Sequence, residues 1–457
     1  MERVLMSGFG LGKRLLGLSL LLAFLPAPAF AADGFSLAGI PLEFALFGVT
    51  LLGVALFHQR TLEVALSGFV VIVLYKLGLT GFSEGSGLAG LGRHFSHEAI
   101  SLINLLLLLL GFSLLARHFE KTRVPAVLPA ILPQGWKGGF ALLVIVFLLS
   151  GFLDNIAAAL IGGAMAHQLF RARVHVAYLV AIVAASNAGG AGSVLGDTTT
   201  TMMWIDGVNP VDVLHAYVPA AVALCVVGIP AALRQQRFSP IIRHAHGHTH
   251  VDWLRVGVVA LILGSALAAN LASNLVFPGL SDSVPVLGLA VWGAILVSAG
   301  LRRPDWEILP ETFKSALFLL CLVSCASLMP VASLPVASWH SAFGLGFVSS
   351  VFDNIPLTAL ALRQGGYDWG GLAYAVGFGG SMLWFGSSAG VALSNQFPEA
   401  KSVSLWLRHG WYAIVAYVIG FAVLLAVVGW QAHPPHKPVF RSGAEQVQVE
   451  VSQRPGS

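Results

Sequence analysis

Apolar stretches of about 20 residues, each long enough to cross a bilayer core as a helix, recur along the chain between short polar loops. Helices satisfy their own backbone hydrogen bonds inside lipid, so the pattern predicts an all-α polytopic membrane protein. We predict about 10 spans, or about 11 with an uncleaved N-terminal segment, plus two hairpins. The uninterrupted spans are Ser36–Phe57, Thr61–Leu79, Ile100–Ala116, Val213–Leu233, Trp253–Phe277, Val284–Ala299, Phe313–Met329 and Trp411–Trp430.

Four further apolar segments are interrupted. Residues 140–166 and 343–362 each contain an aspartate–asparagine pair, whereas residues 176–204 and 372–393 each contain a glycine-rich polar run. Irregular backbone at membrane depth occurs where it lies against protein or lines a cavity. We therefore predict the first two segments as re-entrant hairpins and the other two as discontinuous transmembrane helices.

The N-terminus has the parts of a secretory signal peptide. Lys13 and Arg14 precede an apolar run, Leu15–Leu25, and Ala29-Phe30-Ala31 supplies a small-x-small cleavage pattern. We predict a signal peptide over residues 1–31. The alternative is an uncleaved first membrane helix.

The distribution of lysine and arginine sets the predicted orientation. If the N-terminus after cleavage lies outside and both hairpins return to their own side, sixteen basic residues fall in cytoplasmic loops and three in external loops. This asymmetry agrees with the positive-inside rule, and treating the hairpins as full spans would place the basic stretch 234–255 outside. We expect the bacterial inner membrane, with the mature N-terminus and the C-terminal tail periplasmic.

This topology contains two inverted repeats, each with three spans, a hairpin, a broken helix and a closing span. The first repeat covers residues 32–233 and the second covers residues 253–430. A cytoplasmic linker rich in histidine and arginine, residues 234–252, joins them, and the polar tail 431–457 is expected to be disordered. The linker histidines either bind a transition metal or form a solvated loop, and the sequence leaves both interpretations open.

The repeat is also visible in individual residues. Each half has an Asp-Asn pair followed by two glycine motifs, and each glycine motif of the second half lies 190 residues after its counterpart in the first, since 379 − 189 and 386 − 196 are equal. The matched residues are Asp154-Asn155 and Asp353-Asn354, Gly189-Gly190 and Gly379-Gly380, and Gly196 and Gly386.

Two aspartates at equivalent places inside a membrane require a compensating partner. An ionised Asp at mid-membrane costs about 2.5–3.5 kcal/mol on insertion scales, and a bound cation is one way to offset this cost. Asparagine oxygens and backbone carbonyls, freed where glycine lets a helix unwind, would complete an oxygen shell. Alternatively, the aspartates cap the hairpin helices, which is compatible with ion binding.

These motifs resemble those of NhaD-type sodium/proton antiporters, which belong to the ion transporter superfamily with the citrate transporter-like fold. The resemblance lies within residues 139–420 and is carried by Ser186–Ala191, Gly196–Ile205, Asp353–Leu357, Gly379–Met382 and Gly386–Val391. It implies the inverted-repeat fold and antiport of sodium or lithium against protons by alternating access. It also implies that the protein has no cofactor and forms a homodimer.

The candidate cation- and proton-binding residues are Asp154, Asn155, Ser186, Asn187, Asp197, Thr198, Thr199, Asp353, Asn354, Ser387 and Ser388. The glycines expected at backbone breaks are Gly189, Gly190, Gly196, Gly379, Gly380 and Gly386. No metal is expected beyond transported sodium. The chain departs from the antiporter pattern at Ile156-Ala157-Ala158, where hydroxyl residues are expected, so candidate threonine ligands are missing there.

The charge of these motifs favours a cation over an anion as the substrate. An anion site uses helix N-termini, hydroxyls, amides and Arg or Lys, whereas these motifs contain three aspartates and neither Lys nor Arg. A buried carboxyl group also favours its protonated form when no cation is present, so protons and sodium would compete for one site. The alternative is an anion carrier of the same superfamily, either a citrate or dicarboxylate symporter or an arsenite exporter.

Composition narrows the remaining classes. The chain is 56% hydrophobic and only 10% charged, against about 25% charged residues in soluble proteins. Its pI of about 9.1 arises from basic residues in short loops, so we expect no nucleic-acid partner. The expected partners are the lipid bilayer, a monovalent cation and protons. An intramembrane aspartyl protease would need Gly-x-Gly-Asp, and Val194-Leu195-Gly196-Asp197 lacks the first glycine, so we expect no enzyme.

Overall fold

The computed structural model describes residues 36–37, 40–57, 60–127, 132–241, 250–275 and 280–433. The predicted signal peptide, most of the histidine tract and most of the C-terminal tail lie outside the described residues. The chain is mostly helical. Its contacts divide it into a first unit, residues 1–99, 321–334 and 437–457, and a second unit, residues 100–320 and 335–436.

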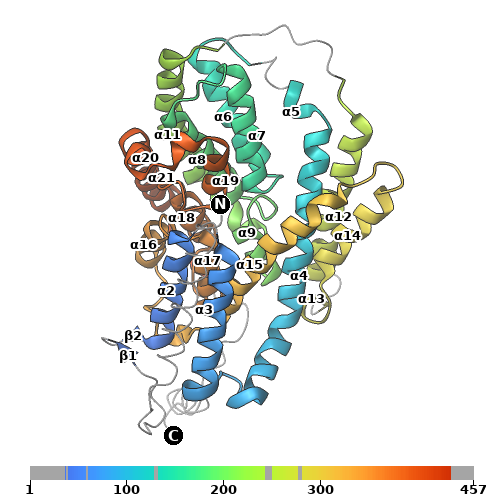
Figure 1. Ribbon diagram of the computed structural model, residues 1–457, viewed down its shortest axis with the longest axis vertical. Helices are drawn as coiled ribbons and strands as arrows, with labels where there is room; N and C mark the ends of the chain where they lie inside the picture. Colours follow the sequence, from blue (N-terminus) through green and yellow to red (C-terminus); the bar gives the residue numbers. More distant parts are fainter. Residues whose placement is uncertain are drawn as a thin grey trace, which may run out of the picture. The chain divides into compact units, whose positions relative to one another are not determined.

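The described part of the first unit starts with two short strands rather than with a helix. β1 (Ser36–Leu37) and β2 (Ile40–Pro41) pair antiparallel, so the all-α prediction is wrong at these four residues. Pro41 is the N-cap of α2 (Leu42–Leu56), where its missing N–H costs no helical hydrogen bond. α3 (Thr61–Tyr75) packs beside α2 and continues into the π-helical turn η1 (Lys76–Thr80) (Figure 1).

α4 (Gly87–Lys121) is longer than the apolar span predicted from Ile100 to Ala116. Its first part contains Arg93 and Glu98, and both residue types are good helix formers although they are not apolar. Apolar run length therefore gave the membrane-facing part of this helix and missed its polar beginning.

The second unit contains two four-helix segments with the same order of elements. In the first, α6 (Trp136–Ser150) and α7 (Asn155–Leu169) form a helix–turn–helix pair, followed by α8 (Val176–Ala191) and, after a break, α9 (Thr198–Ile205). α8 packs against both α6 and α7 (Figure 1).

The second four-helix segment repeats this order near the end of the chain. It consists of α16 (Trp339–Ser349), α17 (Asn354–Gln364), α18 (Trp369–Gly379) and α19 (Ser388–Gln396). α18 packs against α16, as α8 packs against α6, and α18 also contacts α8. The two segments therefore meet through α8 and α18, and also through α7 with α19 and α9 with α17.

α8 and α18 form the centre of the second unit. Every residue of α8 from Ala177 to Ala191 is buried, and so is every residue of α18. Both helices are rich in alanine and glycine, whose small side chains let helix backbones approach closely. Because neighbours surround them, any polar group on these two helices faces protein rather than lipid.

The remaining helices fall into a longer and a shorter group. The longer ones are α11 (Tyr217–Phe238), α12 (Trp253–Leu275), α14 (Val286–Ser298), α15 (Leu309–Ser327), α20 (Val403–Gly410) and α21 (Tyr412–Val427). The short ones are α5 (Val124–Val127), α10 (Val211–Leu214), α13 (Leu280–Ser283), η3 (Trp306–Ile308), η4 (Val331–Ser333) and η5 (Pro398–Lys401). α11 packs along α6, α8 and α21.

Within the described part of the chain, four helical stretches are long and apolar enough to cross a membrane: Thr61–Thr80, Gly87–Lys121, Val211–Phe238 and Trp306–Ser327. α20 and α21, bent by 54°, pass the same test as a pair. Several shorter apolar helices, α6 and α8 among them, complete the pattern. The number of spans stays a prediction.

Candidate functional site

The two Asp-Asn pairs occupy the same place in the two helix–turn–helix pairs. Asp154 is the N-cap of α7 and Asp353 is the N-cap of α17, a position that aspartate favours because its carboxylate accepts hydrogen bonds from free backbone N–H groups. Asp353 Oδ1 accepts from the backbone N–H of Ile355 at 3.2 Å. Its Oδ2 accepts from the Ser388 hydroxyl at 2.7 Å. Asp154 makes no side-chain cap hydrogen bond.

The two glycine-rich runs interrupt helices, as expected for broken helices. α8 ends at Ala191, and Asp197 caps α9 by accepting from the backbone N–H of Thr199 at 3.3 Å. α18 ends at Gly379, and Ser387 caps α19 by accepting from the backbone N–H of Gly390 at 3.2 Å. Asp197 and Ser387 therefore hold equivalent cap positions.

The candidate glycines lie beside these breaks. Gly189 and Gly190 belong to the last turn of α8, Gly379 ends α18 and Gly380 is its C-cap, while Gly196 and Gly386 lie in the irregular runs. A Cβ atom at Gly190 would lie 2.8 Å from the Gly196 carbonyl oxygen, and one at Gly380 would lie 2.7 Å from the Gly386 carbonyl oxygen. Each break thus folds back on its own helix so closely that only glycine fits.

Hydrogen bonds join the first helix–turn–helix pair to α8 and to the break between α18 and α19 through Asn187 on α8. Asn155 Nδ2 donates to Asn187 Oδ1 at 3.1 Å. Asn187 Nδ2 donates to the hydroxyls of Ser381 and Ser387 at 3.0 and 3.1 Å. One fully buried amide therefore connects α7, α8 and the break between α18 and α19.

A further hydrogen bond joins the two four-helix segments, with its donor on the second segment and its acceptor on the first. Asn354 Nδ2, at the start of α17, donates to Asp197 Oδ2 at 3.1 Å. Asp197 is only 2% exposed, and its other carboxylate oxygen bonds the N-terminus of α9. The Asn354 bond, together with the bonds of Asn187, fastens each four-helix segment to the break of the other.

These residues offer oxygen atoms and negative charge. The described residues in hydrogen-bond contact with one another here are aspartates, asparagines, serines and a threonine backbone, without lysine or arginine. Carboxylates, amide oxygens, hydroxyls and the carbonyls of a helix break are the groups that coordinate sodium in broken-helix transporters. The arrangement is suited to a hard cation.

Three of the candidate hydroxyl residues are placed less directly. Ser186 is buried, but its hydroxyl donates to the Val183 carbonyl within its own helix at 2.9 Å. Thr198 and Thr199 open α9 directly after Asp197, with Thr199 buried and Thr198 half-buried. Their position beside a buried carboxylate keeps both threonines within the candidate site.

Sequence reasoning missed three serines. Ser381 accepts a hydrogen bond from Asn187, and the hydroxyls of Ser150 and Ser349 donate to the carbonyls of Ser186 and Val376, fastening α6 to α8 and α16 to α18. A signal was available for two of them, because Ser150 and Ser349 each lie four residues before the aspartate of a hairpin.

No protein-family model matches the chain. Among curated proteins, it is similar to sodium/proton antiporter 1 of Arabidopsis thaliana, with 28% identity over 358 residues. This match covers 69% of the chain and 58% of the relative, so the chain spans less than two thirds of that protein.

Two bacterial relatives carry the name Na(+)/H(+) antiporter NhaD. The protein of Alkalimonas amylolytica is 26% identical over 396 residues, which cover 74% of the chain and 79% of the relative. That of Vibrio parahaemolyticus is 25% identical over 346 residues, which cover 64% of the chain and 80% of the relative. The predicted resemblance to NhaD-type antiporters is thereby confirmed, and with the apolar helices it identifies a multi-pass membrane protein.

Proposed function

We propose that this NhaD-like chain is a secondary active transporter that exchanges sodium or lithium for protons across the bacterial inner membrane by alternating access. The observation that carries the proposal is the hydrogen-bonded network in which Asn354 meets the buried carboxylate of Asp197, while Asn155 meets Asn187. Two hairpin tips and a helix break thus bring acidic and amide groups together without a basic residue among the described partners.

The proposed architecture is the inverted repeat. α6–α7 and α16–α17 are the re-entrant hairpins, α8–α9 and α18–α19 are the broken helices, and the N-terminus after cleavage and the tail are periplasmic. The matched cap positions and matched glycine contacts of the two breaks support this assignment. By resemblance alone, we also propose a homodimer.

Asp154, Asp197 and Asp353 are proposed to carry both the cation and the proton. An ionised carboxylate inside a membrane protein is costly unless it is paired, so each empty site favours taking up a proton. A sodium ion that enters from one side must displace that proton. Competition for the same carboxylates is sufficient to couple the two fluxes in opposite directions.

An anion carrier of the same superfamily is the alternative. It is disfavoured because a dicarboxylate would meet the carboxylate of Asp197, whose described contacts include an amide but neither lysine nor arginine. Citrate or arsenite transport therefore serves as a control substrate rather than as a second proposal.

The test is the dissipation of a pH gradient in everted membrane vesicles when sodium, lithium, potassium or citrate is added. Wild type should respond to sodium or lithium and not to citrate. Asp154→Asn and Asp353→Asn should reduce the response to background, because each removes a ligand charge and a titratable group. The corresponding →Glu variants should keep part of the activity with a changed sodium affinity.

The matched control is Glu63→Gln, which removes one carboxylate from an exposed position on α3. It should transport like wild type. Wild-type rates in both Asp→Asn variants would contradict a cation site at the hairpin tips, and a response to citrate alone would favour the anion carrier.

A further inference from the structure

A second cluster of charge lies away from the aspartates, where α8, α11 and α20 come together. A hollow of about 480 Å³ is lined by the C-terminal end of α11, the start of α8 and the end of α20. The lining residues are Arg234, Arg237 and Phe238 of α11, His175 before α8, and Arg408 and His409 of α20. All of these residues belong to the second unit. Within the described part of the chain, no carboxylate lines this hollow.

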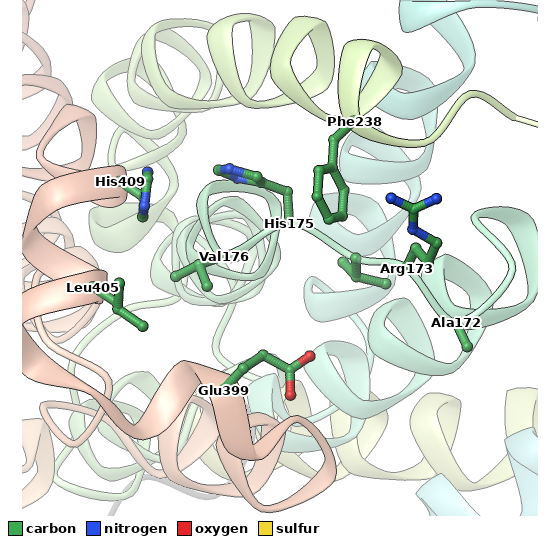
Figure 2. Close-up of a pocket in the computed structure, with 9 residues that line it drawn as sticks. Ala172, Arg173, His175, Val176, Phe238, Glu399, Leu405 and His409 are labelled. Atoms are coloured by element: carbon green, nitrogen blue, oxygen red, sulfur yellow. The ribbon is translucent and has the colours of Figure 1, made fainter.

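Figure 2 shows a neighbouring hollow of about 330 Å³, which shares His175, Phe238 and His409 with the first. The two histidine rings meet edge to face, with centroids 4.9 Å apart and planes at 81°. Arg173 lies beyond Phe238, and the Glu399 side chain extends from the opposite wall. The second hollow thus has mixed charge, whereas the first is purely basic.

In the part of the chain that the structure describes, the arginines of the basic hollow are not paired with acidic side chains. Among the described residues, no ion pair involves Arg234, Arg237 or Arg408. Arg234 instead lies over the Tyr412 ring, 4.8 Å from its centroid, and this contact fixes the position of its guanidinium. The positive charges of three arginines that line one hollow repel one another, and a bound anion would relieve this repulsion.

His175 adds a directed donor to this cluster. Its Nδ1 accepts from the backbone N–H of Ala177 at 3.1 Å, so in the neutral ring the proton is on Nε2. Burial, then the charges of His409 and Arg234, lower the pKa of His175. Nε2–H can still donate when the ring is neutral, and the N-terminal end of α8 beside it carries partial positive charge.

We propose that this cluster is a binding site for a phosphate group. Arginine forks match phosphate oxygens in bidentate geometry, and the helix N-terminus and the His175 N–H provide further donors. The cluster lies where the apolar part of α11 ends in Arg234 and Arg237, as expected at a membrane surface. Two sources share this chemistry: the headgroup of an anionic phospholipid and a soluble phosphate.

The experiment uses the purified full-length protein in detergent and measures both the thermal unfolding temperature and the ligand adducts seen by native mass spectrometry. The probes are phosphatidylglycerol, phosphatidylcholine and inorganic phosphate. The test variant is Arg237→Gln/Arg408→Gln, in which both positions are exposed. The matched control, Arg303→Gln/Lys314→Gln, removes two exposed basic residues that line neither hollow.

Wild type and the control should bind phosphatidylglycerol and be stabilised by it, and phosphatidylcholine should bind much more weakly. In the test variant, affinity for phosphatidylglycerol should fall about tenfold or more, since two of the three arginine charges that attract the anionic headgroup are removed. Arg237→Lys/Arg408→Lys should fall between the two, because charge remains while bidentate geometry is lost.

The measurements with inorganic phosphate distinguish a lipid headgroup from a soluble phosphate as the source of the bound group. Stabilisation by inorganic phosphate alone, lost in the test variant, would identify a soluble ligand, whereas a response only to phosphatidylglycerol would identify the lipid headgroup. Equal binding of both lipids, or equal binding of phosphatidylglycerol by wild type and the test variant, would overturn the proposal. Neither readout depends on transport, so the result is independent of the proposed antiport.

Discussion

The break between α8 and α9 and the break between α18 and α19 have the same backbone plan but different chemistry. The first presents Asn187 and Asp197, and the second presents Gly377 and Ser387 at positions 190 residues later, since 377 − 187 and 387 − 197 are equal. Both caps start the second part of a broken helix. Both segments have a helix, a break and a second helix, whereas only the first break has a carboxylate at its cap.

This difference decides where the hydrogen bonds converge. The asparagines that begin α7 and α17 donate to α8 and to the cap of α9, Asn155 to Asn187 and Asn354 to Asp197. The second break supplies neutral hydroxyls, of which Ser388 bonds Asp353. The two breaks therefore differ in charge, because only the first has a carboxylate at its cap.

Among the variants that test this difference between the breaks, Asp197→Asn should cause the largest loss of transport. It removes the charge that distinguishes the first break, while an asparagine oxygen can still accept from Asn354, so the fold should persist. Sodium-driven proton release in everted vesicles should fall to background. Ser387→Ala, the matched change at the second break, loses a helix cap, at a cost of about 1 kcal/mol, and one of the two hydroxyl acceptors of Asn187, but it removes no charge and should keep measurable transport. Equal loss in both variants would show that the charge at Asp197 is not what matters.

Asn187→Ala should cause the next largest loss of transport. It leaves Asn155, Ser381 and Ser387 without their shared partner, and unsatisfied buried polar groups cost about 1–3 kcal/mol. We expect transport to fall about tenfold and thermal stability in detergent to drop.

Gly377→Ala is the matched variant for this test. Its methyl group would lie 3.5 Å from Asp197 Oδ2, which is an ordinary contact. Transport should stay within about twofold of wild type, since alanine also favours the helix. A severe loss in Gly377→Ala with little loss in Asn187→Ala would reverse the assigned roles of the two breaks.

Gly190→Val and Gly380→Val should affect the two breaks equally. A branched side chain would press on the carbonyl oxygens of Gly196 and Gly386, and overpacking of this kind costs about 1–3 kcal/mol. Both variants should insert in the membrane but lose transport in the vesicle assay. Gly264→Val on α12, where a Cβ meets no atom within 4 Å, is the control and should behave like wild type. Full activity in both test variants would mean that the tight backbone turns are dispensable.

Much of the site could be predicted because its polar residues lie within otherwise apolar stretches of sequence. Charged and amide groups inside apolar runs are rare, so Asp154, Asp353 and their asparagines stood out, and the repeated glycines marked both breaks. Asp197 was found in the same way, from a polar residue beside a glycine in an otherwise apolar helix.

The pairing within the site could not be predicted. That Asn354 would bond Asp197 rather than Asp353 depends on how two segments about 150 residues apart pack together, and no local pattern encodes this. The start of α4 was missed for a related reason: its polar first turns are held by helix propensity rather than by apolar length. Ser381 was missed because serine is common and carries no charge.

The last prediction tests whether the two four-helix segments have opposite orientations in the membrane. The cysteine substitutions that it uses should leave the transport rate unchanged. In a background without the native Cys225, Cys321 and Cys325, single cysteines are placed at the exposed positions Gln134, Ala172 and Val336. Gln134 and Ala172 lie before α6 and after α7, so a re-entrant hairpin keeps both on the cytoplasmic side. Val336 lies before α16 and should react only from outside, as the lysine and arginine distribution requires.

The side from which each cysteine reacts is measured with a membrane-impermeant thiol reagent, applied to intact cells and to everted vesicles. If Gln134 and Ala172 react from opposite sides, α6–α7 is a full crossing; if Val336 and Gln134 react from the same side, the repeats are not inverted.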